Sequence, residues 1–238
     1  ASRSLEVILV AESGDWVVDT EYAMTAPSFS HQHNIIVEGS GHLTFMGTNV
    51  LMIENSTITQ IVVRGDGVLV LDGATINADF SLEVYLFDNA RLYLNSSILL
   101  QNVNLIMDDD SQVFMDNSRV RGKMSAPSSS SVNLVAYNST FDQALSDFGG
   151  NSVAVLTAAT INGIAPVSPK DNAVVHLYSW IVAEVFDGTG LHPLTGVHVE
   201  VNSFPSTPYY TGNTDESGIV LVQALSAIVS SSGPQLFG

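Results

Sequence analysis

A seven-residue phrase recurs six times between Gly39 and Gly163, and it restricts the possible folds more than any other feature of the chain. Each copy begins and ends with a large apolar residue, and its fifth position is always Ser or Ala, a small residue that returns about every 20 positions. A repeat this short is one supersecondary unit that cannot bury its own apolar face, so the copies must stack. The six copies are Met52–Ile58, Val70–Ile76, Leu92–Ile98, Phe114–Val120, Val135–Phe141 and Val155–Ile161.

The alternation inside the phrase indicates a β-strand with one buried face. The small fifth position and the apolar seventh face inward, while the Thr, Ser or Arg between them faces outward, which is a period of two. The residue before the small position is Asn or Gly in five of the six copies, and these residues tolerate the positive φ of a tight corner. Strand, corner and strand, repeated in this way, predict a parallel β-solenoid with about 20 residues per coil, and an ordinary β-sandwich is the alternative.

The repeat divides the chain into two predicted domains, both of them all-β. Residues 1–165 form the solenoid, with Leu5–Val10 and Trp16–Val18 as strands that cap its first coil. A linker follows, and from 173 to 238 the apolar runs are separated by Gly and Pro turns at hairpin spacing. This second pattern predicts a small Ig-like β-sandwich.

Charge and composition exclude several kinds of partner. The chain carries 7 Lys and Arg against 24 Asp and Glu, a formal net charge of −17, which repels nucleic acids and anionic membrane surfaces. No run of about 18 apolar residues is present, so membrane insertion of this segment is not expected. The chain has no Cys, which excludes disulfides and thiolate metal sites. The start at Ala1–Ser4 is typical of a mature terminus after removal of a signal segment, so we expect an extracellular or cell-surface location.

Two parts of the chain resemble known families. Gly14–Val18, Ile35–Gly39 and His42–Phe45 are similar to the first coil of the pectate-lyase-like right-handed parallel β-helix superfamily, in the form found in secreted prokaryotic, especially archaeal, surface proteins. The C-terminal part resembles the carboxypeptidase-regulatory or Ig-like modules of surface proteins, which serve as spacers or adhesive stalks. The residues that carry this second resemblance are Val185, Asp187, Gly190, Pro193, Gly196, Val199, Val201, Thr214, Asp215 and Gly218.

The first resemblance raises the question of polysaccharide cleavage. Asp108-Asp109 and Arg121-Gly122-Lys123 resemble the paired-Asp and Arg-x-Lys elements of the polygalacturonases, but the Gly-His-Gly that lies between these elements in that family is missing here. We therefore predict no catalytic residue and no cofactor. Asp108, Asp109 and Asp110 are a weak candidate for calcium, since carboxylate oxygens are its preferred ligands, and a solvated turn is the alternative.

Three Asn residues stand in N-glycosylation sequons. They are Asn55, Asn95 and Asn138, each followed by Ser and then by Ser or Thr. Because the phrase places Asn at a corner, and corners lie on the surface, glycans at these positions are a hypothesis. The alternative is that Asn is simply the corner residue, which Asn117 supports because it lacks the sequon.

Function is predicted from an apolar column that the solenoid cannot bury. In each copy the first two positions are both apolar, and adjacent strand residues face opposite ways, so one of the two columns must point outward. An outward apolar stripe normally marks a packing surface. The candidates from the second position are Ile53, Leu71, Tyr93, Met115 and Leu156, with Ala136 completing the column.

We therefore expect a structural subunit of a sheath, filament or S-layer-like array, whose partners are further copies of itself. The sandwich is expected to lack a strand, because little chain follows Ile219–Val222, and Leu5–Val10 of a neighbouring copy could supply it through Leu5, Val7 and Leu9. The alternative is that the given chain is part of a longer protein. A polysaccharide-binding or polysaccharide-cleaving protein is the alternative, with Tyr85, Phe87 and Tyr93 as the clustered aromatics that could line a groove for glycans.

Overall fold

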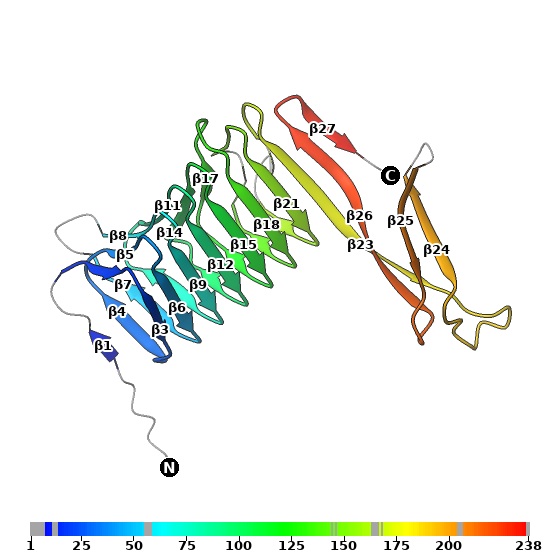
Figure 1. Cartoon of the computed structure of the whole chain (residues 1–238), viewed down its shortest axis with the longest axis horizontal. Coiled ribbons are helices and arrows are strands. Elements are labelled where there is room, and N and C mark those ends of the chain that lie inside the picture. Colours follow the sequence, from blue (N-terminus) through cyan, green and yellow to red (C-terminus); the bar gives the residue numbers. More distant parts are fainter. Residues whose placement is uncertain are drawn as a thin grey trace, which may run out of the picture.

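The fold is a parallel β-solenoid that ends in a long β-ribbon. The computed structural model describes residues 8–10, 14–54, 59–143, 145, 147–162, 167, 169–203 and 207–236, and these residues form strands and turns without any helix. The solenoid has about seven turns of roughly 21 residues, which confirms the predicted repeat. Figure 1 shows the turns stacked into a rod, with the N-terminal strands at one end and the ribbon at the other.

Each turn contributes one strand to each of three parallel sheets, A, B and C. Sheet A contains β1 (Ile8–Val10), β4 (Ser28–His31), β7 (Asn49–Met52), β10 (Thr75–Ala78), β13 (Ile98–Leu99), β16 (Arg119–Val120), β19 (Thr140–Phe141) and β22 (Thr160–Ile161). Sheet B contains β2 (Trp16–Val18), β5 (Ile35–Val37), β8 (Gln60–Val63), β11 (Leu82–Leu86), β14 (Val103–Met107), β17 (Met124–Ala126) and β20 (Asp147–Phe148). Sheet C contains β3 (Glu21–Met24), β6 (His42–Met46), β9 (Val68–Asp72), β12 (Arg91–Asn95), β15 (Gln112–Asp116), β18 (Asn133–Tyr137), β21 (Val153–Thr157), β23 (Val174–Glu184), β26 (Ile219–Ser230) and β27 (Gly233–Leu236).

The core fills the space between the three sheets with alternate residues of every strand. In β12, for example, Leu92 and Leu94 are buried while Tyr93 between them is half-exposed. Equivalent residues of successive turns stack directly, since Leu92 pairs with Leu69 on one side and with Val113 on the other. The burial of these stacked apolar residues holds the turns together, because a single turn has no core of its own.

Strand pairing corrects the alignment of two of the six phrases. Leu94, not Tyr93, lies in register with Leu71 and Met115, so the inward small residue of that turn is Ser97 rather than Ser96. Ser96 is the corner residue, with a φ of 49°. The sequence Asn-Ser-Ser fits the phrase in two ways, and its local pattern does not distinguish them.

The first phrase, Met52–Ile58, belongs to a different part of the turn. Met52 ends a strand of sheet A, and residues 55–58 lie outside the described part of the chain. The true equivalent is Thr48, a buried residue that follows the positive-φ corner at Gly47. The predicted positive φ is confirmed at Gly73, Asn117, Asn138 and Ala158.

A ladder of buried hydroxyl groups connects these corners along the rod. The backbone N–H of Ala74 donates to the Ser97 hydroxyl at 3.0 Å, that of Ser97 to the Ser118 hydroxyl at 3.0 Å, and that of Ser118 to the Ser139 hydroxyl at 3.2 Å. Each hydroxyl donates in turn to a carbonyl of its own corner, as Ser118 does to Asp116 at 2.8 Å. Ser is suited to this small inward position for two reasons. Its side chain fits the tight interior, and its hydroxyl accepts the backbone N–H of the corner in the neighbouring turn.

The chain beyond the last turn extends sheet C. The first half of β23 pairs with β21 in parallel, and the whole of β23 pairs with β26 in antiparallel orientation. A separate hairpin of β24 (His198–Ser203) and β25 (Thr207–Asn213) packs near β26. The described residues among 173–236 thus continue the solenoid as a ribbon and a hairpin, and they do not show the two packed sheets of the expected sandwich.

The N-terminal capping strand covers the edge of sheet A. Ile8–Val10 (β1) pairs with β4 of its own chain. Leu5 and Val7, the other predicted donor residues, lie outside the described residues, as does the side chain of Leu9. No helix in the described ranges is long and apolar enough to cross a membrane.

Candidate functional site

The outer face of sheet C carries a continuous apolar column, and this column is the candidate site. Its members are half-exposed and stack in register along the rod. The column consists of Val70, Tyr93, Phe114, Val135 and Val155. We predicted an outward apolar stripe, with five candidate residues from the second position of the phrase. Of these five residues, Tyr93 alone lies in the observed column.

The other predicted stripe residues do not belong to this face. Leu71, Met115 and Leu156 are at most 2% exposed and point into the core, so their assignment to the stripe is wrong. Ile53 is half-exposed but follows a strand of sheet A. The error has a simple cause, because both columns are apolar and a single copy of the phrase does not show which of the two faces outward.

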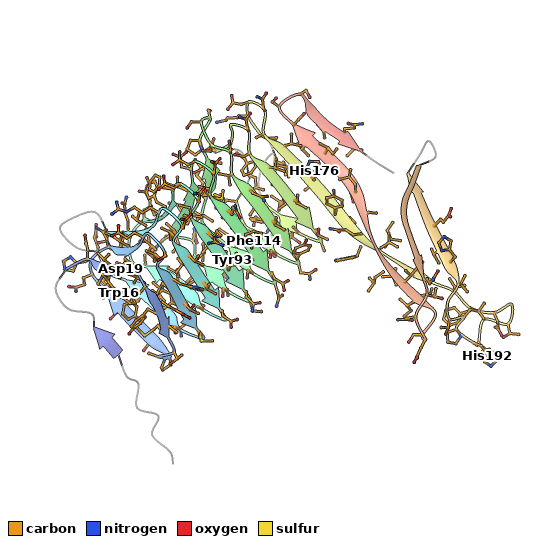
Figure 2. The ribbon with its side chains drawn as sticks, in the orientation of Figure 1. Trp16, Asp19, Tyr93, Phe114, His176 and His192 are labelled. Carbon is orange, nitrogen blue, oxygen red and sulfur yellow. The ribbon has the colours of Figure 1, made fainter. Side chains whose placement is uncertain are left out.

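The centre of the apolar column forms a shallow hollow of about 170 Å³. Tyr93 and Phe114 stack across it, with ring centroids 5.0 Å apart and ring planes 12° from parallel. Val135 and the 41%-exposed Tyr137 extend its apolar wall, and Asn95 and Asp116 supply polar groups at one side. Figure 2 shows Tyr93 and Phe114 next to each other in the middle of the rod.

The apolar face continues from the solenoid onto the ribbon. Residues of β23 alternate, so Trp180 and Val182 lie on the same face as Tyr178, and Tyr178 is in register with Thr157 of β21. Trp180 is 44% exposed and Val182 is 55% exposed. The side chain of Gln223, which pairs with Trp180, donates to the Thr157 hydroxyl and holds ribbon and solenoid together at this point.

The three predicted groove aromatics do not form one cluster. Tyr85 and Phe87 stack at 5.3 Å on the sheet B side of the rod, whereas Tyr93 lies on sheet C. The structure instead brings together Tyr93, Phe114 and Tyr137, of which sequence reasoning had placed Phe114 in the core. The spacing of 21 residues between equivalent positions could have identified this cluster had the phrases been aligned on Ser97 and Ser118.

The Asp108–Asp110 run forms a corner between sheets B and C. The Asp108 carboxylate accepts hydrogen bonds from the Ser130 hydroxyl at 2.7 Å and from its neighbour's backbone N–H at 2.8 Å. Asp109 has a φ of 51°, and its carboxylate accepts the backbone N–H of Asp88 in the preceding turn. Nowhere in the described residues do three or more His, Asp or Glu side chains converge into a group that could hold a metal ion. Calcium at these aspartates stays a prediction, with the solvated turn as its alternative.

The residues that resemble polygalacturonase elements lie at opposite ends of the sheet B strands. Lys123 sits beside Asn104 at the start of β14, and Asp108 follows the end of that strand, four residues or about 13 Å further along. Arg121 and Lys123 are ion-paired with Asp142 and Asp147 instead. The arrangement therefore gives no support to shared chemistry between these two elements.

Asp147 links three turns of the solenoid through ion pairs. Its carboxylate accepts hydrogen bonds from the ammonium groups of Lys123 and, at 2.8 Å, of Lys170. These bonds, that of Lys123 first, lower the pKa of the Asp147 carboxyl from its ordinary value near 3.8 to about 2. A depressed carboxyl pKa stabilises the folded state at pH values above 3.8, and this contribution is lost as the pH falls toward 2.

Replacing Asp147 with Asn should remove that pH-dependent contribution. We expect a modest loss of thermal stability at pH 7, because the pair is partly exposed and screened by solvent. We also expect a shallower fall of stability between pH 4 and pH 2 than in the unmodified protein. Thermal unfolding followed by circular dichroism at several pH values measures both, with Asp110→Asn as the charge-matched control. An unchanged slope in the Asp147 variant would contradict the assignment.

The sequon residues that the structure describes are exposed. Asn95 is the last residue of β12, and Asn138 is a corner residue with a φ of 47°. Both amides lie along the same edge of the rod, between sheets C and A. Asn55 lies outside the described residues. Glycans at these positions stay a prediction.

Comparison of the chain with protein-family models, with curated protein sequences and with solved structures finds no match. The class of the protein therefore comes from its own fold: it is a parallel β-solenoid protein with a C-terminal ribbon.

Proposed function

We propose that the chain is a structural subunit of an extracellular surface assembly, such as a sheath, filament or S-layer-like array. Its copies associate through strand pairing and through the apolar outer face of sheet C. The observation that carries this proposal is the column from Val70 to Val155, which His176 continues in register on β23, with Trp180 and Val182 on the same face of the ribbon. A contiguous apolar surface of this kind is favourable to cover and unfavourable to leave in water.

The charge of the chain supports contact on this particular face. At a net charge of −17, two copies repel one another unless they meet where carboxylates are sparse. The apolar column itself carries no charged residue from Val70 to Val155. The proposal includes a prokaryotic, archaeal surface origin and a sandwich of residues 173–238 that is completed only within the assembly, both of which derive from the sequence resemblances.

Replacing Phe114 with Asp tests the proposed contact. The unmodified protein should form ordered polymers in electron microscopy, and the variant should need at least about tenfold more protein to assemble, because a central aromatic anchor contributes about 2 kcal/mol or more to an interface. Thr75→Asp, which adds the same charge to the outer face of sheet A, is the matched control and should assemble normally. Equal assembly of the two variants would contradict the proposal.

A second candidate function is polysaccharide binding at the hollow on sheet C. The stacked Tyr93 and Phe114 rings, with Tyr137 and the Asp116 carboxylate beside them, offer an apolar platform with a polar group at its side. Sites for small ligands combine these two features. Calorimetric titration of dispersed protein with neutral and acidic oligosaccharides distinguishes the candidates, since binding that is lost in Phe114→Ala, without polymers in the unmodified protein, would favour the second.

A further inference from the structure

The outer half of β23 is an open strand edge. Its first half, Val174–Tyr178, pairs with β21, but in the described part of the chain no strand pairs with that same edge from Trp180 to Glu184. Trp180, Ile181, Val182 and Glu184 are all exposed. Charged side chains, Pro and β-bulges usually protect natural edge strands from pairing. From Trp180 to Glu184 the segment has one charged residue, Glu184, and neither Pro nor a bulge.

The hydrogen bonds of β23 identify which backbone groups are free at the open edge. The carbonyl of Tyr178 accepts from Ala158 N–H at 3.0 Å, on the β21 side, and Val185 N–H donates to Gly218 O at 2.8 Å, on the β26 side. Because strand residues alternate in direction, Trp180, Val182 and Glu184 present their N–H and C=O groups to the open edge. An array of this kind is matched by another extended strand.

We infer that this edge pairs with the same edge of a second copy, in antiparallel orientation and with a twofold axis at Val182. The inference rests on the proposed function and names the strand contact of that assembly. In this register Val182 faces its own counterpart and Trp180 faces Glu184 of the second copy. The backbone N–H and C=O groups that Trp180, Val182 and Glu184 direct to the open edge are then all paired, in about six hydrogen bonds between the two copies.

Charge favours a second copy in this register. Glu184 is the one charged residue in the Trp180–Glu184 segment. The part of β26 that pairs with this segment, from Ile219 to Gln223, contains no charged residue. The twofold register places the two Glu184 carboxylates at opposite ends of the contact, about 13 Å apart along the strands, beyond the screening length of about 8 Å. Two chains of charge −17 can therefore approach here without close carboxylate pairs.

The contact also explains how a polymer could grow. A twofold contact alone closes into a dimer. If the outer face of sheet C supplies a second, different twofold contact, alternation of the two joins dimers into an open array.

A cysteine cross-link tests the register directly, because the chain has no Cys of its own. In a hydrogen-bonded antiparallel pair the Cα atoms are about 5.5 Å apart, within the range of a disulfide. The full-length Val182→Cys variant should therefore form a covalent dimer under mild oxidation, seen on a non-reducing gel. Leu221→Cys, at the directly paired position on the other edge of the ribbon, is the matched control and should stay monomeric.

A second variant measures the strength of the contact without oxidation. Val182→Pro removes an N–H that points to the open edge, so pairing with β26 is retained. Sedimentation velocity should show a dimer dissociation constant raised at least about tenfold, whereas Leu221→Pro should leave it unchanged; circular dichroism confirms that each variant is folded. A dimer that survives Val182→Pro and fails to cross-link would overturn the inference.

The remaining outcomes separate the inference from the proposed function. Polymers that are lost in Phe114→Asp but persist in Val182→Pro would keep the function and overturn this contact. Stable dimers that depend on Val182 but never polymerise would support the contact and count against the function. Loss of the dimer on deletion of residues 1–10, with Val182→Pro unchanged, would overturn the contact in favour of a donated N-terminal strand.

Discussion

Ser118→Leu is expected to lower the free energy of unfolding by about 1–3 kcal/mol from overpacking alone. The side chain is 4% exposed and lies at the narrow corner between sheets C and A. The variant also removes the hydroxyl that accepts the backbone N–H of Ser97 at 3.0 Å. A buried N–H left without a partner costs about 1–3 kcal/mol more, so the total loss should be one of the largest for a single substitution in the solenoid.

Two further variants separate the contributions of volume and hydrogen bonding. Ser118→Ala keeps the volume small and loses the hydroxyl, so it should show the hydrogen-bond cost alone. Thr140→Lys changes an outward residue of the neighbouring strand and should shift stability by less than about 0.5 kcal/mol. Urea unfolding followed by circular dichroism measures all three. An equal loss in Ser118→Leu and Thr140→Lys would mean that inward and outward columns are misassigned.

Gly122→Ala is the second substitution for which a large effect is expected. A Cβ atom at this position would lie 1.9 Å from the carbonyl oxygen of Val103 and 2.6 Å from its carbon. Both atoms belong to the backbone of the preceding turn, which cannot move without breaking the parallel ladder. We therefore expect a loss at or above the upper end of the overpacking range, about 3 kcal/mol, or a failure to fold.

Two other glycines serve as controls for Gly122. At Gly188 nothing lies within 4 Å of the added Cβ and φ is not positive, so Gly188→Ala should be nearly neutral. At Gly47 the space is open but φ is +61°, so Gly47→Ala should show a conformational cost of about 1–2 kcal/mol. Similar melting temperatures for Gly122→Ala and Gly188→Ala would contradict the close packing of successive turns.

The repeat made the solenoid predictable because every turn must satisfy the same packing condition. A strand column stays apolar, and a corner residue stays Asn, Gly or small, for physical reasons that recur about every 21 residues. The alignment of the individual turns was harder to predict from the sequence. Asn95, Ser96 and Ser97 allow two alignments, and only pairing with Asp72 and Asp116 selects the correct one.

An outward apolar stripe was predicted from the sequence, but most of the residues that form it were not. Two adjacent apolar positions require that one faces outward, yet nothing within a single copy tells Val70 from Leu71, since both are suitable for a core. The choice depends on the neighbouring turns, which bury Leu71 completely. Aligning the copies one position away therefore exchanges the buried and exposed columns.

The C-terminal part could not be assigned from local pattern for a related reason. The β-rich runs that became β23 and β26 are apolar on both faces, as strands of a sandwich are, but they are also 11 and 12 residues long. A strand of that length can pair with the last turn at one end and extend beyond it at the other. Which strand pairs with which is a long-range property that the alternation of side chains does not contain.

The corner ladder gives the rod an adjustable length. Ser118 and Ser139 are 21 residues apart and occupy the same place in successive turns, so duplicating that interval would insert one more turn bonded like its neighbours. Each insertion would add about 4.8 Å to the rod and leave β1 and the ribbon as they are. In a rod built in this way, the number of turns therefore sets the distance between its two ends in equal steps.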